Sequence, residues 1–303
     1  MPAYPYLFSM ILFSNIGGTS TLIGDPPNIM IGSAVGLSFN DFLFHLSPVI
    51  VVIMAATLIP LYFIWGRRLR ATEDRNRVMD FNERESITDT TLLRKCLAII
   101  AVVILGFVFA RSLELEAATI AMTGAALLLL ITNWGQDAEH QSHQVRHAFF
   151  EIEWITIFFF VGLFVVVHGL DSTGLLKWLA EKVVDLTGGD LNATALMTLW
   201  ASAILSAFVD NIPFVATMIP LIKSMAPTFG GPEGLMPLWW SLALGACLGG
   251  NGTLIGASAN LVVSGFAERA GQPIRFVSFL LMAFPLMLLS IAISTIYLYL
   301  RYL

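Results

Sequence analysis

The sequence predicts an all-α polytopic membrane protein, arranged as an inverted repeat with broken helices and a re-entrant hairpin, in which the first repeat is incomplete. Three observations predict this class. Of the 303 residues, 57% are hydrophobic and only 12% are charged, with a mean hydropathy of +0.79. A polar interruption of an apolar segment occurs twice at a fixed offset. Several apolar runs are long enough to cross a hydrocarbon core of roughly 30 Å.

The interruption is the clearest signal in the chain. Residues 15–28 read Asn-Ile-Gly-Gly-Thr-Ser-Thr-Leu-Ile-Gly-Asp-Pro-Pro-Asn, and residues 247–260 read Cys-Leu-Gly-Gly-Asn-Gly-Thr-Leu-Ile-Gly-Ala-Ser-Ala-Asn. With an offset of 232, seven of the twelve positions from 17 to 28 are identical in the second copy. Glycine- or proline-interrupted hydrophobic segments at matching places in two halves indicate a transporter binding site.

The predicted elements divide the chain into two parts. Residues 1–92 are the remainder of a first repeat, with a broken helix at 3–36 and a span at 43–65. A cytoplasmic loop at 66–95 follows the span. Residues 93–303 are a second repeat, with spans at 96–110, 115–132 and 152–170, an interfacial amphipathic helix at 172–186, a hairpin at 191–225, a broken helix at 235–267 and a last span at 276–300. Residues 133–150 are expected to be a polar loop. The loop 66–95 holds eight Lys or Arg residues, which the positive-inside rule places in the cytoplasm.

The hairpin prediction fixes the relative direction of the two broken helices. Asp210-Asn211-Ile212-Pro213 interrupts an apolar run, and the apolar residues that follow end near Ile222, too soon to span a membrane. Four full crossings therefore separate the two broken helices, which we expect to run antiparallel. The first repeat lacks the spans and hairpin of the second, roughly 140 residues if the halves are alike. This predicts an N-terminal truncation, a partial gene model or half of a complex.

The breaks supply the candidate site. The first half-helix ends near Asn15 and would offer carbonyls to a cation, whereas the second begins near Asn28 and would offer amides to an anion. Glycines in the loop permit positive φ and close backbone approach. The predicted substrate- and ion-binding residues are Asn15, Gly17, Gly18, Thr21, Gly24, Asp25, Asn28, Asp210, Asn211, Pro213, Thr217, Gly249, Gly250, Asn251, Thr253 and Asn260.

Asp25 and Asp210 are the two carboxylates predicted to lie deep in the membrane. A charged Asp at the bilayer centre costs at least about 2.5 kcal/mol, which makes such a residue a functional hypothesis. Each would couple transport to a cation or a proton. The alternative role is capping, of the half-helix after Pro26-Pro27 by Asp25 and of the arm opened by Pro213 by Asp210.

The motif Gly24-Asp25-Pro26-Pro27-Asn28 resembles the ion transporter superfamily of citrate-transporter-like permeases, arsenite permeases, NhaD-type sodium/proton antiporters and the melanosomal P protein. Residues 15–28, Glu153-Trp154 with 158–164, and Phe208-Val209-Asp210-Asn211 look most like the P-protein branch. The resemblance implies a scaffold domain and a transport domain, a homodimer and an elevator-like mechanism. Related divalent-anion symporters have Ser-Asn-Thr at their hairpin tips, where this chain has Asp210-Asn211-Ile212.

The predicted function is secondary active transport of an anion, an inorganic oxyanion or a carboxylate, coupled to Na⁺ or H⁺. The open alternatives are a Na⁺/H⁺ antiporter, an ion channel, and a fragment inactive without its missing N-terminal half. No Walker A, His-Glu-x-x-His or Gly-x-Ser-x-Gly motif occurs, so an ATPase or enzyme is not predicted. We expect a multi-pass protein of the bacterial inner membrane or its equivalent, with no cofactor, no bound metal other than Na⁺ at the breaks, and no nucleic-acid partner.

Overall fold

The computed structural model describes residues 4–66, 87 and 89–303. Within these ranges every regular element is helical, and five helices are long and apolar enough to cross a membrane. The prediction of an all-α polytopic membrane protein is confirmed. Most of the arginine-rich loop predicted at 66–95 lies outside the described residues.

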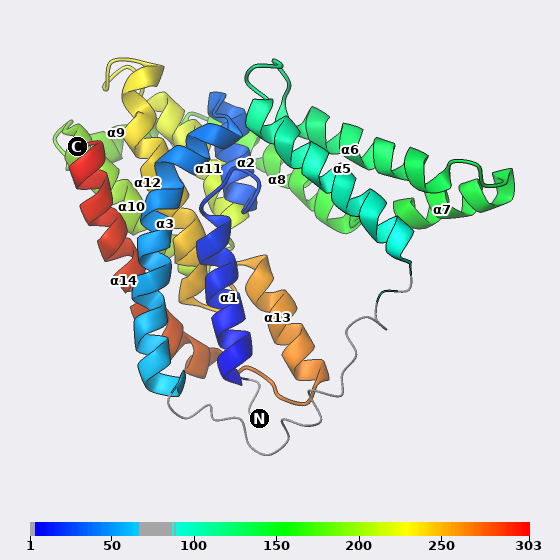
Figure 1. The fold of residues 1–303 in the computed structure, drawn as a ribbon. Coiled ribbons are helices and arrows are strands. Elements are labelled where there is room, and N and C mark those ends of the chain that lie inside the picture. The colour runs from blue at the N-terminus through cyan, green and yellow to red at the C-terminus, as the bar shows by residue number, and fades with distance from the viewer. Residues whose placement is uncertain (1–3, 67–86, 88) are drawn as a thin grey trace. The chain divides into compact units, whose positions relative to one another are not determined.

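The chain forms two compact units (Figure 1). One, the core unit, comprises Met1–Leu37, Asp41–Arg67 and Val161–Leu303, and the other, the second unit, comprises Ser38–Asn40 and Arg68–Phe160. Both broken helices and the hairpin belong to the core unit.

The first broken helix consists of α1 (Tyr4–Gly18) and α2 (Pro26–Val35). Two prolines occupy the first turn of α2, where their fixed φ suits a helix start and their missing N–H groups leave no intrahelical bond unmade. Gly36, with φ of 75°, ends the helix in the left-handed conformation. We call residues 19–25, between the two halves, the first break.

The second broken helix consists of α12 (Met236–Gly249) and α13 (Ser258–Arg269), joined through the 3₁₀ turn η4 (Gly250–Gly252) and preceded by the 3₁₀ turn η3 (Pro232–Leu235). We call residues 250–257 the second break. From Leu238 to its end α12 is fully buried, and small residues bring it close to α10 (Leu191–Phe208). A Cβ added at Gly245 would lie 2.6 Å from the carbonyl oxygen of Leu199. Such small-residue packing is the usual way in which membrane helices associate.

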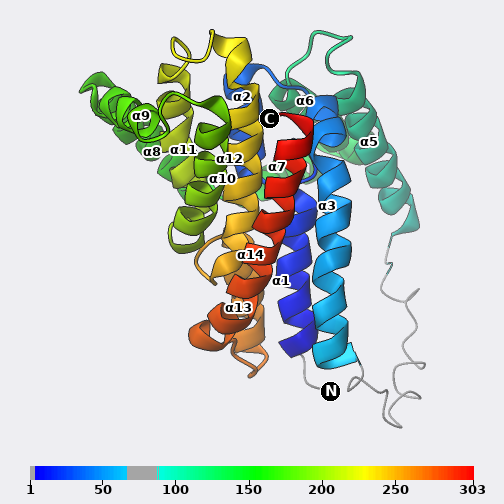
Figure 2. The ribbon, with the colours of Figure 1, turned by 90° about the vertical axis from the view of Figure 1, so that its left-hand side faces the viewer.

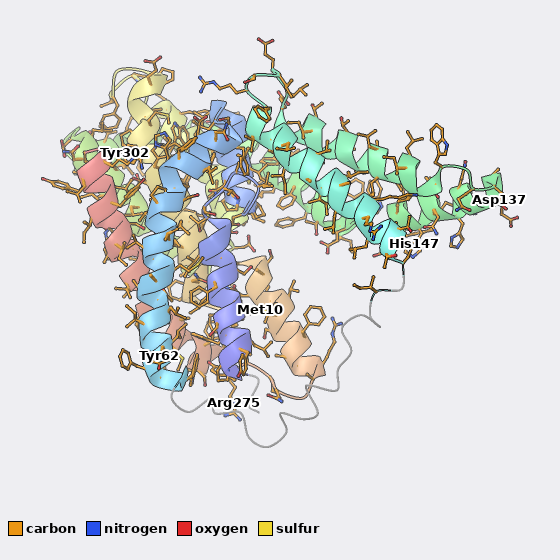
Figure 3. The ribbon with its side chains drawn as sticks, in the orientation of Figure 1. Met10, Tyr62, Asp137, His147, Arg275 and Tyr302 are labelled. Carbon is orange, nitrogen blue, oxygen red and sulfur yellow. The ribbon has the colours of Figure 1, made fainter. Side chains whose placement is uncertain are left out.

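The two broken helices run in opposite directions (Figures 1 and 2). The α3 helix (Phe39–Leu61), which continues as the π-helical turn η1 (Tyr62–Gly66), and α14 (Phe276–Arg301) run antiparallel to each other in the same views. Figure 3 shows Tyr62 and Arg275 at one end of the core unit and Tyr302 at the other. The segments α1–α2–α3 and α12–α13–α14 therefore follow the same course with inverted direction.

The predicted hairpin corresponds to α10 and α11 (Asn211–Ser224), which meet at residues 209–211, here called the hairpin tip. The α9 helix (Leu175–Leu186) begins after Gly174 and follows α8 (Trp154–Ser172). Leu176 of α9 packs with Val167 of α8 and Ala216 of α11. Because α10 alone is long enough to cross a membrane, the re-entrant character of the hairpin stays a prediction.

The second unit contains α5 (Thr90–Phe109), α6 (Ala117–Asn133) and α7 (Ala138–Phe150). Phe107, Ala110 and Ile120 form its small apolar cluster. The α7 helix corrects the prediction of a polar loop at 133–150. Its residues 138–147 are polar apart from Ala138 and Val145, so the segment lacks the apolar stripe from which a helix could have been predicted.

Candidate functional site

Both breaks and the hairpin tip converge inside the core unit. Asn211, at the hairpin tip, donates from Nδ2 to the two carboxylate oxygens of Asp25, at 3.3 and 3.5 Å. Asn15, in the last turn of α1, donates to Oδ1 of Asn251 at 2.9 Å and to Oδ1 of Asn260 at 2.8 Å. Five predicted residues are thus brought together in two sets of contacts, and all five are buried.

Pairs of glycines close each break in the same way. A Cβ at Gly18 would lie 2.5 Å from the carbonyl oxygen of Gly24. In return, a Cβ at Gly24 would overlap the carbonyl oxygen of Gly18. At the equivalent positions of the second break, a Cβ at Gly250 would lie 3.0 Å from the oxygen of Gly256. None of these four glycines has a positive φ. The prediction of positive φ was wrong, and the glycines are there for close backbone approach.

An equivalent asparagine follows each break. Asn28 donates from Nδ2 to the carbonyl oxygens of Thr19, at 3.1 Å, and of Thr21, at 3.0 Å. Asn260 donates to the carbonyl oxygens of Gly250 and Thr253, both at 2.8 Å. Buried carbonyls at membrane depth need donors, and these amides provide them.

Asp25 is a buried carboxylate that does not cap its helix. It precedes α2 in extended conformation, with φ of −144° and ψ of 135°, and makes no side-chain cap bond. Its equivalent Ala257 has almost the same backbone, with φ of −152° and ψ of 145°. An alanine thus starts the matching helix without any side-chain acceptor. The helix start does not explain the carboxylate, so the capping alternative loses its support at Asp25.

Asp210 has a different environment. Its Oδ1 accepts from the backbone N–H of Ile212 at 3.0 Å, which makes it the N-cap of α11. It is only partly buried. The structure therefore gives Asp210 the capping bond that Asp25 lacks.

The two breaks differ in the donors that they expose to a ligand. Pro26 and Pro27 have no N–H, and the N–H groups of Asn28 and Ile29 both donate to the carbonyl oxygen of Asp25. The expectation of free amides near Asn28 is therefore wrong. The α13 helix, in contrast, begins with Ser258, which has an N–H.

Other predicted residues lie at the edge of the site or outside it. Pro213 and Thr217 are within α11, and the Thr217 hydroxyl donates to the carbonyl oxygen of Phe214 in its own helix. A Cβ at Gly17 would meet only the Met54 methyl, at 3.9 Å, so no close contact requires that glycine. Gly249 packs against Ala203 of α10, and the hydroxyl of Thr253 donates to the carbonyl oxygen of Ala207, also in α10.

Sequence reasoning missed Cys247 as a member of the site. Its thiol donates to Oδ1 of Asn28 at 3.5 Å. The signal was available, because the offset of 232 pairs Cys247 with Asn15. It was passed over because a buried cysteine in an apolar helix usually behaves as a small hydrophobe.

Two inverted broken helices around a buried carboxylate, in a polytopic helical fold, define an integral multi-pass membrane transporter. The chain belongs to the citrate transporter family, whose model it matches over residues 1–245. An uncharacterized transporter of Mycobacterium tuberculosis is 41% identical over 297 residues, which cover 98% of this chain and 67% of that protein. An uncharacterized transporter of Synechocystis is 32% identical over 97% of this chain and 67% of its own length. The P protein of Sus scrofa is 31% identical over 96% of this chain and 43% of its own length.

Proposed function

We propose that this transporter carries an anion, an inorganic oxyanion or a carboxylate, together with Na⁺ or H⁺, at a site between the two breaks and the hairpin tip. The contact between Asn211 and Asp25 is the observation on which the proposal depends. It joins a candidate ion-coupling carboxylate to the end of a helical arm. A change in the charge of Asp25 would therefore reach the hairpin directly.

Asp25 is the proposed coupling group. It is 8% exposed, and the side chain that hydrogen-bonds to it, Asn211, is uncharged. A buried carboxylate is costly unless a cation or a proton neutralises it. Pro26 and Pro27 have no N–H, so a cation bound here would meet this carboxylate and no competing amide from the first turn of α2.

The anion would bind toward the second break. There α13 begins with Ser258, which has an N–H, and helix N-termini favour negative charge through their N–H groups and dipole. The name of the family supports this substrate class, since citrate is a carboxylate anion.

Na⁺/H⁺ antiport is the second candidate, and one observation favours it. The proline pair removes amide donors from the first break and leaves a carboxylate as its main polar group. An exchanger needs a site that binds Na⁺ and H⁺ in turn, and a single buried carboxylate meets that need without any anion.

Transport assays with reconstituted vesicles separate these possibilities. A pH-sensitive dye reports proton movement after Na⁺ addition, and labelled citrate, phosphate and arsenite report uptake. We expect saturable, gradient-driven anion uptake that Asp25→Asn abolishes without preventing membrane insertion. The matched control is Asp171→Asn, at an exposed site at the end of α8. Na⁺-driven proton movement without anion uptake would support the antiporter instead, and undiminished coupled flux in Asp25→Asn would contradict both.

A further inference from the structure

The asparagines after the two breaks each make a second contact, which crosses to the other repeat. Oδ1 of Asn260, in the second repeat, accepts from Nδ2 of Asn15 in α1, at 2.8 Å. Oδ1 of Asn28, in the first repeat, accepts from the thiol of Cys247 in α12, at 3.5 Å. With the offset of 232, Asn15 corresponds to Cys247 and Asn28 to Asn260. The two contacts are thus equivalent. One runs from the first repeat to the second, and the other from the second repeat to the first.

These contacts use every side-chain hydrogen of the two amides. Each NH₂ group donates to two carbonyl oxygens of its own break, and each Oδ1 accepts from the helix of the opposite repeat. Asn28 and Asn260 are both fully buried. An amide with every hydrogen donated inside the protein has no donor left for a substrate.

We infer that Asn15, Asn28, Cys247 and Asn260 form a reciprocal lock that couples the shape of each break to the other repeat, with Cys247 as the positioning residue of the first break. The lock changes the role of Asn28 and Asn260 from ligands to structural links. Cys247 acts on Asp25 through Asn28, whose side chain accepts from the thiol and whose backbone N–H donates to the carbonyl oxygen of Asp25 at 3.0 Å.

The two halves of the lock differ in strength. A thiol is a weak hydrogen-bond donor, whereas the Asn15 amide is a normal one, so the contact of Cys247 with Asn28 is the weaker of the two. The first break, which contains Asp25, is therefore held less firmly than the second. A break that must respond to a coupling ion would benefit from the weaker link.

The first test does not depend on transport. A double-mutant cycle with Cys247→Ala and Asn28→Ala is measured by SDS-induced unfolding in detergent, with a second cycle of Asn15→Ala and Asn260→Ala. Polar contacts in membrane proteins couple by about 0.6 kcal/mol, so we expect non-additivity of about threefold in the unfolding equilibrium. Cys96→Ala, in α5 of the second unit, combined with Asn28→Ala serves as the additive control. Additive effects in the two lock cycles would overturn the inference.

The second test rests on the proposed function. Cys247→Ala should raise the half-saturating concentration of the coupling ion by about threefold, for the same reason, with little change in the maximal rate, and Cys247→Ser should restore it because serine keeps a donor. If Cys247→Ala does not insert, Cys247→Thr and Cys247→Val make the same comparison, since only threonine keeps a donor. Equal half-saturation with and without the donor would contradict the positioning role. Non-additive cycles in a chain without coupled flux would keep the lock and reject the proposed function.

Discussion

Asp25 and Asp210 show how much the role of a residue depends on its neighbours. Both are aspartates beside a proline-containing helix start, and from the sequence alone either one could couple transport to an ion or cap a helix. The structure gives the cap bond to Asp210 and none to Asp25. Asp25 instead contacts a side chain from the hairpin tip. The difference arises from tertiary contacts that no local sequence pattern encodes.

For Asp210 this difference predicts an effect on stability. Asn is as good an N-cap as Asp, whereas Ala is not, so Asp210→Ala should destabilise the protein by about 1 kcal/mol and Asp210→Asn hardly at all. Asp210→Asn should also retain coupled flux. Unfolding in detergent and flux in vesicles check the two statements, with Asp190, the N-cap of α10, mutated in the same way as a control. Loss of coupling in a stable Asp210→Asn variant would show that both carboxylates take part.

At these positions the sequence could predict which residues meet but not what they do. The repeat singled out Asn15, Asn28, Asn251 and Asn260, and the structure brings all four to the breaks. Whether an amide binds a ligand or a carbonyl depends on side-chain direction, which a repeat does not specify. Cys247 was missed because a cysteine in an apolar helix is usually a packing residue, although its position in the repeat matches that of Asn15.

In each broken helix, the glycines determine how closely the two sides of the break approach each other. At Gly24 a methyl group would meet the backbone of Gly18, including its Cα at 2.8 Å and its carbonyl carbon at 2.9 Å. Backbone atoms cannot rotate away as a side-chain end can. At Gly265, within α13, an added Cβ meets nothing within 4 Å. Gly24→Ala therefore tests the close backbone approach, whereas Gly265→Ala tests helix propensity alone.

We predict that Gly24→Ala destabilises the protein by about 1–3 kcal/mol through overpacking, whereas Gly265→Ala leaves it unchanged or stabilises it by up to about 1 kcal/mol. Gly256→Ala should resemble Gly24→Ala, because its Cβ would lie 2.7 Å from the carbonyl oxygen of Gly250. Unfolding in detergent measures all three. A Gly24→Ala protein as stable as Gly265→Ala would mean that the first break is open enough to accept a side chain.

Element boundaries were predictable wherever an apolar run begins or ends at a strong signal. The last span was expected at 276–300 and is α14 (Phe276–Arg301), and the break after Gly18 and the restart at Pro26 follow the glycines and prolines. The α7 helix was not predictable in this way, because a polar helix has no hydrophobic periodicity. Contacts between elements, such as the close approach of α10 and α12, also depend on small residues whose partners a sequence does not name.

For the whole molecule, the inverted direction of the repeats is the property on which transport would depend. Two half-sites related by inversion present equivalent groups to the two sides of a membrane, which is how many transporters alternate access. In the core unit the inversion extends from the helices to individual bonds, since Asn28 with Thr21 and Asn260 with Thr253 make the same contact. The symmetry is incomplete at Asp25, because the equivalent position in the second repeat is Ala257. If Asp25 is the coupling group, as we propose, the two repeats would share a single coupling site.

The inversion makes a topological prediction that labelling can test. In the core unit, the C-terminal end of α2 and the N-terminal end of α12 lie at one end, and the C-terminal end of α13 lies at the other (Figures 1 and 2). The positive-inside rule, applied to the arginines of 66–95 and to Arg269 and Arg275, places residue 272 in the cytoplasm. Single cysteines at Leu37, Glu233 and Gln272 are introduced in a Cys96→Ser background, where the remaining Cys247 is fully buried.

A membrane-impermeant maleimide added to intact cells should then label Leu37→Cys and Glu233→Cys but not Gln272→Cys, and the pattern should reverse in everted vesicles. Detergent-solubilised protein, in which all three sites react, controls for accessibility. The two broken helices can have opposite directions in the membrane only if positions 37 and 272 face opposite sides. Labelling of both from the same side would contradict the inverted repeat, and with it the idea that the two breaks form one site reachable from each side in turn.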